Sequence, residues 1–157
     1  DLGTRFLLET AEIRPGSKVL DLGCGCGPVG IFAALCGADV TMTDIEPAAI
    51  KACRKGLAEN GVAACLTPGD AFEGVDQTGF DLILSNPPYH TDYAVAKRFI
   101  EKGFNRLKIG GKLALVVKRP LWYEKKLRSI FGGVKITCRD GYSVLISEKR
   151  SDRYANK

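Results

Sequence analysis

The stretch KVLDLGCGCGPVG, residues 18–30, decides the fold class of this chain. Its first five residues form a short apolar run typical of a buried strand, and a turn with three glycines follows. Pro28 then suits the first position of a helix, because its fixed φ is already helical. Strand, glycine turn and helix in this order are typical of the start of a βαβ unit.

The same alternation of short apolar runs and helical patterns continues along the chain. We expect helices at residues 4–11, 28–36, 47–60, 93–107 and 121–131, and strands at residues 18–22, 39–43, 63–67, 80–85, 112–117, 134–139 and 142–148. Only Asp140 and Gly141 separate the last two strands, and such a pair is typical of a hairpin turn. The sequence therefore predicts an α/β fold with a doubly wound, mostly parallel sheet and an antiparallel strand near the C-terminus.

Length and composition fit one such domain. With 157 residues, 45% of them hydrophobic, the chain can bury one sizeable core but not two. We assign residues 1–150 to the domain and residues 151–157 to a polar tail that frays. No run approaches the roughly 20 apolar residues that span a bilayer, and no leader pattern precedes a cleavage site. We therefore expect a cytoplasmic protein without membrane contact.

Six cysteines raise the question of disulfides or a metal site. Because they lie mostly inside apolar periodic segments, we interpret them as free, buried thiols. Cys24 and Cys26 have the wrong spacing for a metal pair, and the only histidine, His90, is far along the chain, so we expect no metal. The formal charge of +5 fits an anionic partner such as RNA.

The glycine turn is the predicted cofactor loop. In an open α/β sheet, ligands bind beyond the carboxyl ends of the strands, where Gly23, Cys24, Gly25 and Gly27 lie. Glycines let the backbone approach a ligand closely, and the next helix offers unpaired N–H groups. A Gly-x-Gly-x-Gly turn also occurs in purely structural loops, so the acidic residues around it carry the argument.

Three acidic residues lie at the ends of predicted strands. Asp44 and Ile45 come about 20 residues after the glycine turn, where an acid can accept hydrogen bonds from both ribose hydroxyls of an adenosine cofactor. Asp21 fits poorly near a pyrophosphate but suits an ammonium group, which favours S-adenosylmethionine over a nicotinamide dinucleotide. Asp70 and Ala71 follow the third strand, from which a side chain can reach an adenine amino group. The alternatives are a helix cap for Asp44 and a turn role for Asp70.

The predicted acceptor site is the turn Asn86-Pro87-Pro88-Tyr89, which directly follows the fourth predicted strand. Methyl transfer to an exocyclic amine needs acceptors for the amine hydrogens, and the carbonyls of the Asn86 side chain and the Pro87 backbone can supply them. The two prolines make the turn rigid, and Tyr89 offers a flat face for a flipped-out base. The alternative is an ordinary turn in which Tyr89 covers the edge of the core.

Two of these motifs resemble a known class of enzyme. Residues 19–27, VLDLGCGCG, look like the first cofactor motif of class I methyltransferases, and residues 86–89, NPPY, look like the motif of their amino-group branch. The opening residues 1–8, the run 26–30, His90 and the stretch 131–144 are similar to the small-domain family that includes ribosomal RNA guanine-N2 methyltransferases. This resemblance covers nearly the whole chain.

The resemblance implies a seven-stranded sheet with S-adenosylmethionine as the cofactor. It also implies that Asp44 contacts the ribose, that Asp70 and Ala71 lie near the adenine, and that Asn86 and Pro87 hold the target amine. We therefore expect a methyltransferase acting on guanine N2 of ribosomal RNA.

Other activities remain open at this point. The same four-residue turn serves adenine-N6 and protein glutamine methyltransferases, and a non-catalytic RNA-binding module of the same fold is an alternative from a different class. Intact Asp21, Asp44 and Asn86 argue against an inactive copy. Around Trp122 and Tyr123 lie basic residues that form either an RNA surface or a solvated helix face. These are Lys118, Arg119, Lys125, Lys126 and Arg128.

Overall fold

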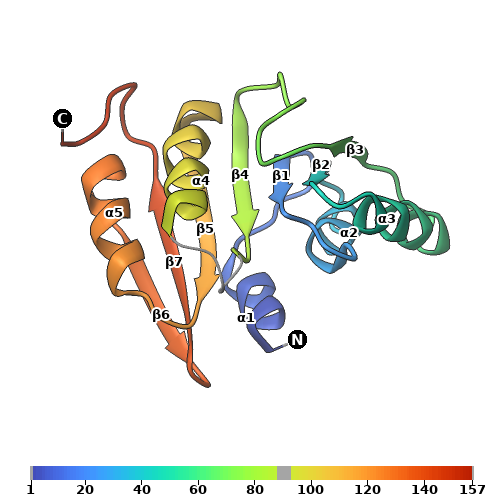
Figure 1. The fold of residues 1–157 in the computed structure, drawn as a ribbon, viewed down its shortest axis with the longest axis horizontal. Helices are drawn as coiled ribbons and strands as arrows, with labels where there is room; N and C mark the ends of the chain where they lie inside the picture. The colour runs from blue at the N-terminus through green and yellow to red at the C-terminus, as the bar shows by residue number, and fades with distance from the viewer. Residues whose placement is uncertain (1, 88–92, 157) are drawn as a thin grey trace.

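The computed structural model of the protein describes residues 2–87 and 93–156 (Figure 1). The helices in this part of the chain are α1 (Leu2–Thr10), α2 (Pro28–Leu35), α3 (Pro47–Glu59), α4 (Tyr93–Arg106) and α5 (Leu121–Phe131). The strands are β1 (Lys18–Leu22), β2 (Asp39–Asp44), β3 (Cys65–Pro68), β4 (Phe80–Ser85), β5 (Leu107–Val117), β6 (Lys135–Arg139) and β7 (Tyr142–Glu148). The helix and strand alternation expected from the sequence is therefore confirmed.

The strands form one seven-stranded sheet in the order β3-β2-β1-β4-β5-β7-β6. The first five run parallel, whereas β7 pairs antiparallel with both β5 and β6. Asp140 and Gly141 both have positive φ, 52° and 81°, as a two-residue hairpin turn requires. The predicted doubly wound sheet with an antiparallel C-terminal strand is thus confirmed.

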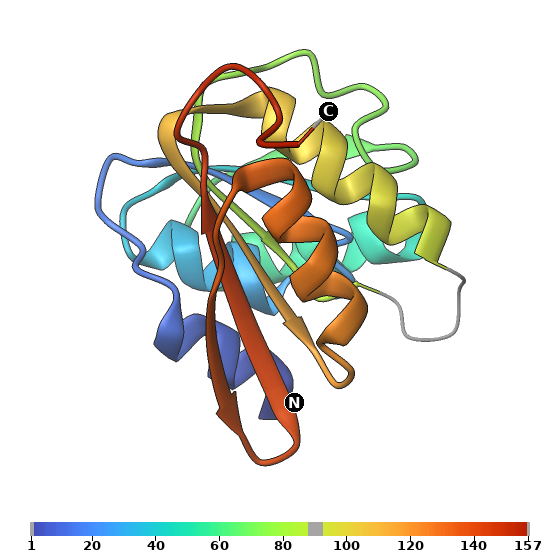
Figure 2. The ribbon, with the colours of Figure 1, turned by 90° about the vertical axis from the view of Figure 1, so that its left-hand side faces the viewer.

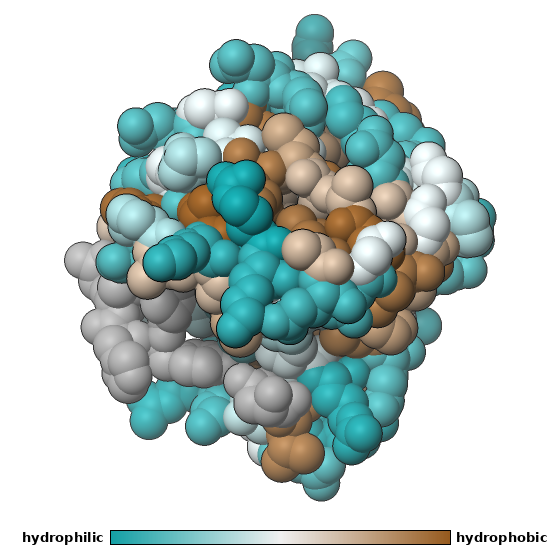
Figure 3. Space-filling view, turned by 90° about the vertical axis from the view of Figure 1, so that its right-hand side faces the viewer, coloured by the Kyte–Doolittle hydropathy of each residue, from teal (hydrophilic) through white to brown (hydrophobic). Residues whose placement is uncertain are grey.

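Helices cover both faces of this sheet (Figures 1 and 2). Buried side chains of α1, α2 and α3 pack on one face in a cluster that includes Leu7, Ala33 and Leu57. Those of α4 and α5 pack on the other face, with Ile100 and Leu127 among them. At the β3 edge of the sheet, patches of apolar side chains are interrupted by hydrophilic ones (Figure 3). In the described part of the chain, no helix combines the length and apolar character needed to cross a membrane.

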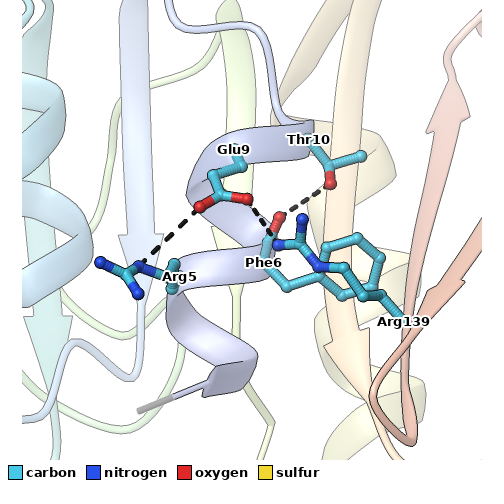
Figure 4. A network of polar contacts seen from close by, with 5 residues as sticks. All are labelled: Arg5, Phe6, Glu9, Thr10 and Arg139. Carbon is cyan, nitrogen blue, oxygen red and sulfur yellow. Dashed lines mark hydrogen bonds and ion pairs between the residues drawn. The ribbon is translucent and has the colours of Figure 1, made fainter.

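Polar contacts join α1 to the far end of the β6–β7 hairpin (Figure 4). Glu9 accepts a hydrogen bond from Arg139 at 2.5 Å and forms an ion pair with Arg5 at 3.8 Å. The Arg139 guanidinium also lies 4.5 Å from the centroid of the Phe6 ring. Exposed ion pairs contribute little stability, so this network chiefly fixes the position of α1 against the sheet.

The start of β5 differs from the prediction, which placed residues 107–111 before the strand. The strand begins at Leu107 and contains a register shift, since Phe80 pairs with Leu107 but Leu82 pairs with Lys112. Glycine permits this irregularity: a Cβ on Gly111 would lie 2.6 Å from the Phe80 carbonyl oxygen. The bulge depends on close contact with β4, which helix and strand patterns do not report.

The described C-terminal residues, 151–156, do not fray as expected. The Tyr154 ring packs edge-on against Phe104, with the centroids 5.1 Å apart. The backbone N–H of Ala155 donates to the Ile130 carbonyl oxygen at 2.9 Å. Polar composition predicted solvent exposure, but one aromatic side chain and two backbone hydrogen bonds hold this segment against α4 and α5.

Candidate active site

The glycine loop connects β1 to α2 and depends on left-handed backbone. Gly23, Gly25 and Gly27 have φ of 67°, 56° and 95°, which L side chains rarely adopt. A Cβ on Gly27 would also meet the Cys53 sulfur at 3.0 Å. The three glycines are therefore required by conformation, and at Gly27 by packing as well.

Asp44, the last residue of β2, holds this loop in place. One carboxylate oxygen accepts a hydrogen bond from the Gly25 backbone N–H at 2.9 Å, and the other accepts one from the Glu46 N–H at the same distance. The carboxylate thus links the glycine loop to the start of α3. The helix-cap alternative for Asp44 is not borne out, because α3 begins after Glu46 without a side-chain cap hydrogen bond, and Asp44 lines the cavity described below.

Asp21 lies in β1 with only 3% of its surface exposed. One of its carboxylate oxygens accepts a hydrogen bond from the Gly30 N–H at 2.9 Å, at the beginning of α2. The pKa of Asp21 is raised to about 7, chiefly by burial and also by the nearby Asp44 carboxylate, while the Gly30 hydrogen bond lowers it. A positive group in front of this loop would therefore meet a carboxyl that ionises readily in its presence.

Cys24 lies behind the loop. Its sulfur is 3.3 Å from the Cys53 sulfur, and its backbone N–H donates to the Thr43 carbonyl oxygen at 2.8 Å. Burial raises the pKa of both thiols. Cys24 therefore contributes backbone and packing to the loop. Cys26, Cys65 and Cys138 are exposed, so the expectation that the cysteines are buried is wrong for them, whereas all six thiols are free.

A cavity of about 500 Å³ opens at the carboxyl ends of the parallel strands. It brings together six of the predicted site residues: Gly23, Asp44, Ile45, Asp70, Ala71 and Asn86. A larger hollow of about 700 Å³ lies elsewhere, beside α1, and is lined by apolar residues such as Leu2 and Phe32 together with polar ones such as Arg5. We regard the smaller cavity as the candidate site, because strand ends and carboxylates converge on it.

Four further residues line the cavity and were missed from the sequence: Thr43, Val95, Arg98 and Phe99. Thr43 is fully buried, and its hydroxyl oxygen has no hydrogen-bond partner within the described residues. Arg98, on the first turns of α4, forms an ion pair with Asp70 at 3.3 Å. A threonine inside a strand has no sequence signal of this role, and the face that α4 turns to the cavity depends on tertiary packing.

The predicted acceptor turn begins at this cavity. The Ser85 hydroxyl donates to the Leu22 carbonyl oxygen at 3.2 Å, which joins the end of β4 to the end of β1. Asn86 follows, half-buried and lining the cavity, and Pro87 is buried. Pro88, Tyr89 and His90 lie outside the described residues. Across residues 2–87 and 93–156, no three His, Cys, Asp or Glu side chains gather closely enough to hold a metal ion.

The sheet order, the glycine loop and the position of the cavity are those of the Rossmann-like class I methyltransferase fold. The chain belongs to the methyltransferase small domain family, whose model matches residues 1–146. The predicted family resemblance is therefore confirmed.

Several relatives in this family carry similar names. Ribosomal RNA small subunit methyltransferase C of Haemophilus influenzae (strain PittGG) is 37% identical over 155 residues, covering 95% of this chain and 47% of the relative. The protein of the same name from Chromohalobacter salexigens is 39% identical over 148 residues, covering 89% of this chain and 44% of the relative. The chain thus spans about half the length of the curated relatives it matches.

Solved structures agree with this assignment. A T. thermophilus 16S rRNA N2 methyltransferase (RsmC), in complex with AdoMet and guanosine, has a TM-score of 0.89 and 32% identity. The match covers 96% of this chain and 43% of that one. A methyltransferase from Pyrococcus furiosus has a TM-score of 0.80 at 23% identity, covering 96% of this chain and 83% of that one, and supports the fold alone.

Proposed function

We propose that this domain transfers a methyl group from S-adenosylmethionine to the exocyclic N2 of guanine in ribosomal RNA, in the cytoplasm. The observation that carries the proposal is the shared cavity, because Asn86 at the end of β4 lines the same space as Asp44 and Asp70. Groups suited to an adenosine cofactor and a group suited to an amine thus face each other.

The residues around the cavity fit S-adenosylmethionine. The glycine loop offers backbone without side chains, and Asp44 lies at the end of β2, where a ribose would be reached. Thr43 contributes a buried hydroxyl that lacks a partner among the described residues, and such a group is costly unless a ligand or water satisfies it. Asp21, buried behind the loop, supplies a carboxyl that ionises in the presence of an ammonium group.

When bound, S-adenosylmethionine supplies an electrophilic methyl group on a positively charged sulfur. Asp44 lines the cavity, and the buried Asp21 carboxyl, with a pKa of about 7, ionises more readily when a cationic ligand is bound nearby. Ile45 and Ala71 add apolar surface, while the Asp70 carboxylate can accept a hydrogen bond from an adenine amino group. Arg98 holds that carboxylate at the cavity wall through the 3.3 Å ion pair.

The acceptor side depends on Asn86 and Pro87. Their carbonyl oxygens accept the two hydrogens of the target amine, which turns its lone pair toward the cavity and fixes the direction of attack. A strong general base is unnecessary, because the amine releases its proton easily once it is methylated. The roles expected from the sequence for Pro88, which would make the turn rigid, and Tyr89, which would stack on an extruded base, belong to residues outside the described ranges.

The names of the relatives favour the N2 amine of guanine over the other two candidate amines. The T. thermophilus protein is named as an N2 methyltransferase of 16S rRNA and was solved with guanosine, and the curated relatives are named for the small-subunit ribosomal RNA. Adenine N6 and protein glutamine are outcomes that the experiment below distinguishes.

Titration calorimetry with S-adenosylhomocysteine tests the cofactor site. We expect the unaltered chain to bind in the micromolar range and Asp44→Ala to lose binding. Asp39→Ala is the matched control, because Asp39 is an exposed aspartate at the opposite end of the same strand. Thr43→Val should weaken binding while leaving the Gly25–Asp44 hydrogen bond intact. Failure of the unaltered chain to bind would overturn the enzyme proposal and favour a non-catalytic RNA-binding module.

Mass spectrometry then identifies the acceptor. Small-subunit ribosomal RNA, free and within the assembled subunit, is incubated with the chain and S-adenosylmethionine and digested to nucleosides. N2-methylguanosine is expected, and Asn86→Ala should abolish it while retaining S-adenosylhomocysteine affinity within a few fold. Detection of N6-methyladenosine would instead identify adenine as the acceptor. Methylated glutamine in the ribosomal proteins would identify a protein acceptor.

A further inference from the structure

The beginning of α5 lies at the same edge of the sheet as the predicted acceptor turn. Strands β4 and β5 are parallel neighbours, and Ser85 pairs with Leu115. Asn86 therefore leaves the sheet beside the last residues of β5, and Lys118 and Arg119 follow that strand directly. Figure 2 shows α4 and α5 side by side on the same face of the sheet.

Two aromatic rings join the first turns of these helices. Tyr93, the first residue of α4, stacks on Trp122, in the first turn of α5, with ring centroids 4.4 Å apart and planes inclined by 8°. The buried Tyr123 meets both rings edge-on. Tyr93 remains 44% exposed, so a large flat side chain is presented at the surface on a supported platform.

Basic residues flank Trp122 in the sequence. Residues 118–128 contain five basic residues and one acidic residue. Glu124 pairs with Arg128 at 3.4 Å, and Lys126 pairs with Glu101 at 3.1 Å. Within the described ranges, Arg119 and Lys125 are exposed and form no ion pair. Lys118 lies 5.4 Å from the centroid of the Tyr142 ring, which packs on the opposite face of the sheet, so Lys118 is not part of the platform.

We propose that this aromatic–basic cluster, defined as Tyr93, Arg119, Trp122 and Lys125, binds the single-stranded RNA that adjoins the methylated nucleotide. The inference rests on the proposed function. Stacked aromatic rings next to cations match an unpaired base and its phosphates, since bases stack on aromatic faces and phosphates require positive charge. A protein partner would be favoured by a broader apolar surface and by acidic groups free to form ion pairs. Glu124, the one acidic residue of this stretch, is already paired with Arg128.

The position of the cluster relative to the cavity supports this assignment. On α4, Val95 and Phe99 line the cavity, whereas Tyr93 stacks toward α5. The cluster and the proposed cofactor site thus lie on two sides of the same helix end, with the Asn86 turn leading into that helix. An RNA strand on the cluster would reach the acceptor turn without occupying the cofactor cavity.

Fluorescence anisotropy with a short, fluorescein-labelled single-stranded RNA tests the proposal. Tyr93→Leu should weaken binding at least about fivefold, because one stacked base is lost, and should leave the salt dependence unchanged. Arg119→Gln/Lys125→Gln should lower the slope of log affinity against log salt by about 1.4, the value for two phosphate contacts on a single strand. Tyr93→Phe keeps the ring and should retain affinity.

Lys112→Gln/Lys135→Gln is the matched control for charge. Both lysines are exposed, lie at the opposite edge of the sheet and have no ion pair among the residues described. Equal weakening by this control pair, unchanged affinity in the cluster variants, or no RNA binding by the unaltered chain would each overturn the proposal. Loss of binding to assembled small subunits alone would reassign the cluster to a ribosomal protein. Calorimetry with S-adenosylhomocysteine on the same variants separates these results from failure of the proposed function, because cofactor affinity should not change.

Discussion

Asp21 combines a buried carboxyl with a hydrogen bond from the Gly30 N–H at the beginning of α2. Its pKa is about 7 in the folded protein, against an ordinary value of about 3.8 for an aspartate. Between these pH values the folded chain binds a proton that the unfolded chain has released, so the free energy of unfolding falls as the pH rises from about 4 to about 7. Above that range the ionised, buried carboxylate continues to destabilise the fold.

Asp21→Asn should therefore be more stable than the unaltered protein at pH 8, by about 1 to 3 kcal/mol, and similar to it near pH 4. The asparagine keeps a carbonyl oxygen that can accept the Gly30 N–H. Urea unfolding of both proteins between pH 4 and 8 measures the difference. Parallel pH profiles would show that burial of the Asp21 charge has no cost to folding.

The sequence predicted those cavity-lining residues whose side chains have a distinctive chemistry and lie at strand ends. Asp44, Asp70 and Asn86 follow strands and do meet at one cavity, as expected from their positions in the βαβ pattern. Thr43 and Arg98 could not be selected in this way. Thr43 and Arg98 line the cavity because of the way β2 and α4 are turned toward the loop at Asp70. Tertiary packing determines that orientation.

At the level of elements, α2 packs closely on β2 because Gly30 has no side chain. A Cβ at Gly30 would lie 2.6 to 2.7 Å from three atoms of Met42, which is fully buried. We expect Gly30→Ala to lower the free energy of unfolding by about 1 to 3 kcal/mol, because overpacking forces the helix away from the strand. Chemical denaturation measures the loss.

Met42→Ala should remove this clash, although it leaves space of its own. The combined variant should therefore be more stable than the sum of the two single effects predicts, by at least about 0.5 kcal/mol. Gly103→Ala is the control on α4, since its Cβ would meet neighbours only at 3.8 Å. Additive single effects would contradict the packing explanation.

Helices and strands were predictable where the periodicity of apolar residues agreed with the position of turn residues such as glycine and proline. The boundaries of β4 and α5 match the expected ranges residue for residue. The bulged start of β5 and the docked Tyr154 escaped prediction for a shared reason. Each is stabilised by a contact with a remote segment, Phe80 in one instance and Phe104 in the other, and local sequence has no record of such contacts.

For the whole molecule, the central strands connect the two buried clusters on opposite faces of the sheet. Val19 belongs to one cluster and Leu20 to the other, and the same alternation occurs at Ala114 and Leu115. Loss of either cluster would expose one face of strands whose other face belongs to the second cluster. We therefore expect residues 1–150 to unfold as a single cooperative domain.

Leu57→Ala tests this expectation from the face opposite to the only tryptophan, Trp122 on α5. Loss of the buried Leu57 side chain should cost about 2 to 5 kcal/mol, and it should shift the Trp122 fluorescence transition and the far-UV circular dichroism transition equally. If the proposed function is right, S-adenosylhomocysteine at a hundred times its Kd should raise the free energy of unfolding by about 2.7 kcal/mol, as measured by both transitions. A fluorescence transition that stays in place while the dichroism transition moves would divide the chain into two folding units, because α5 would then unfold independently of the sheet face that carries α3.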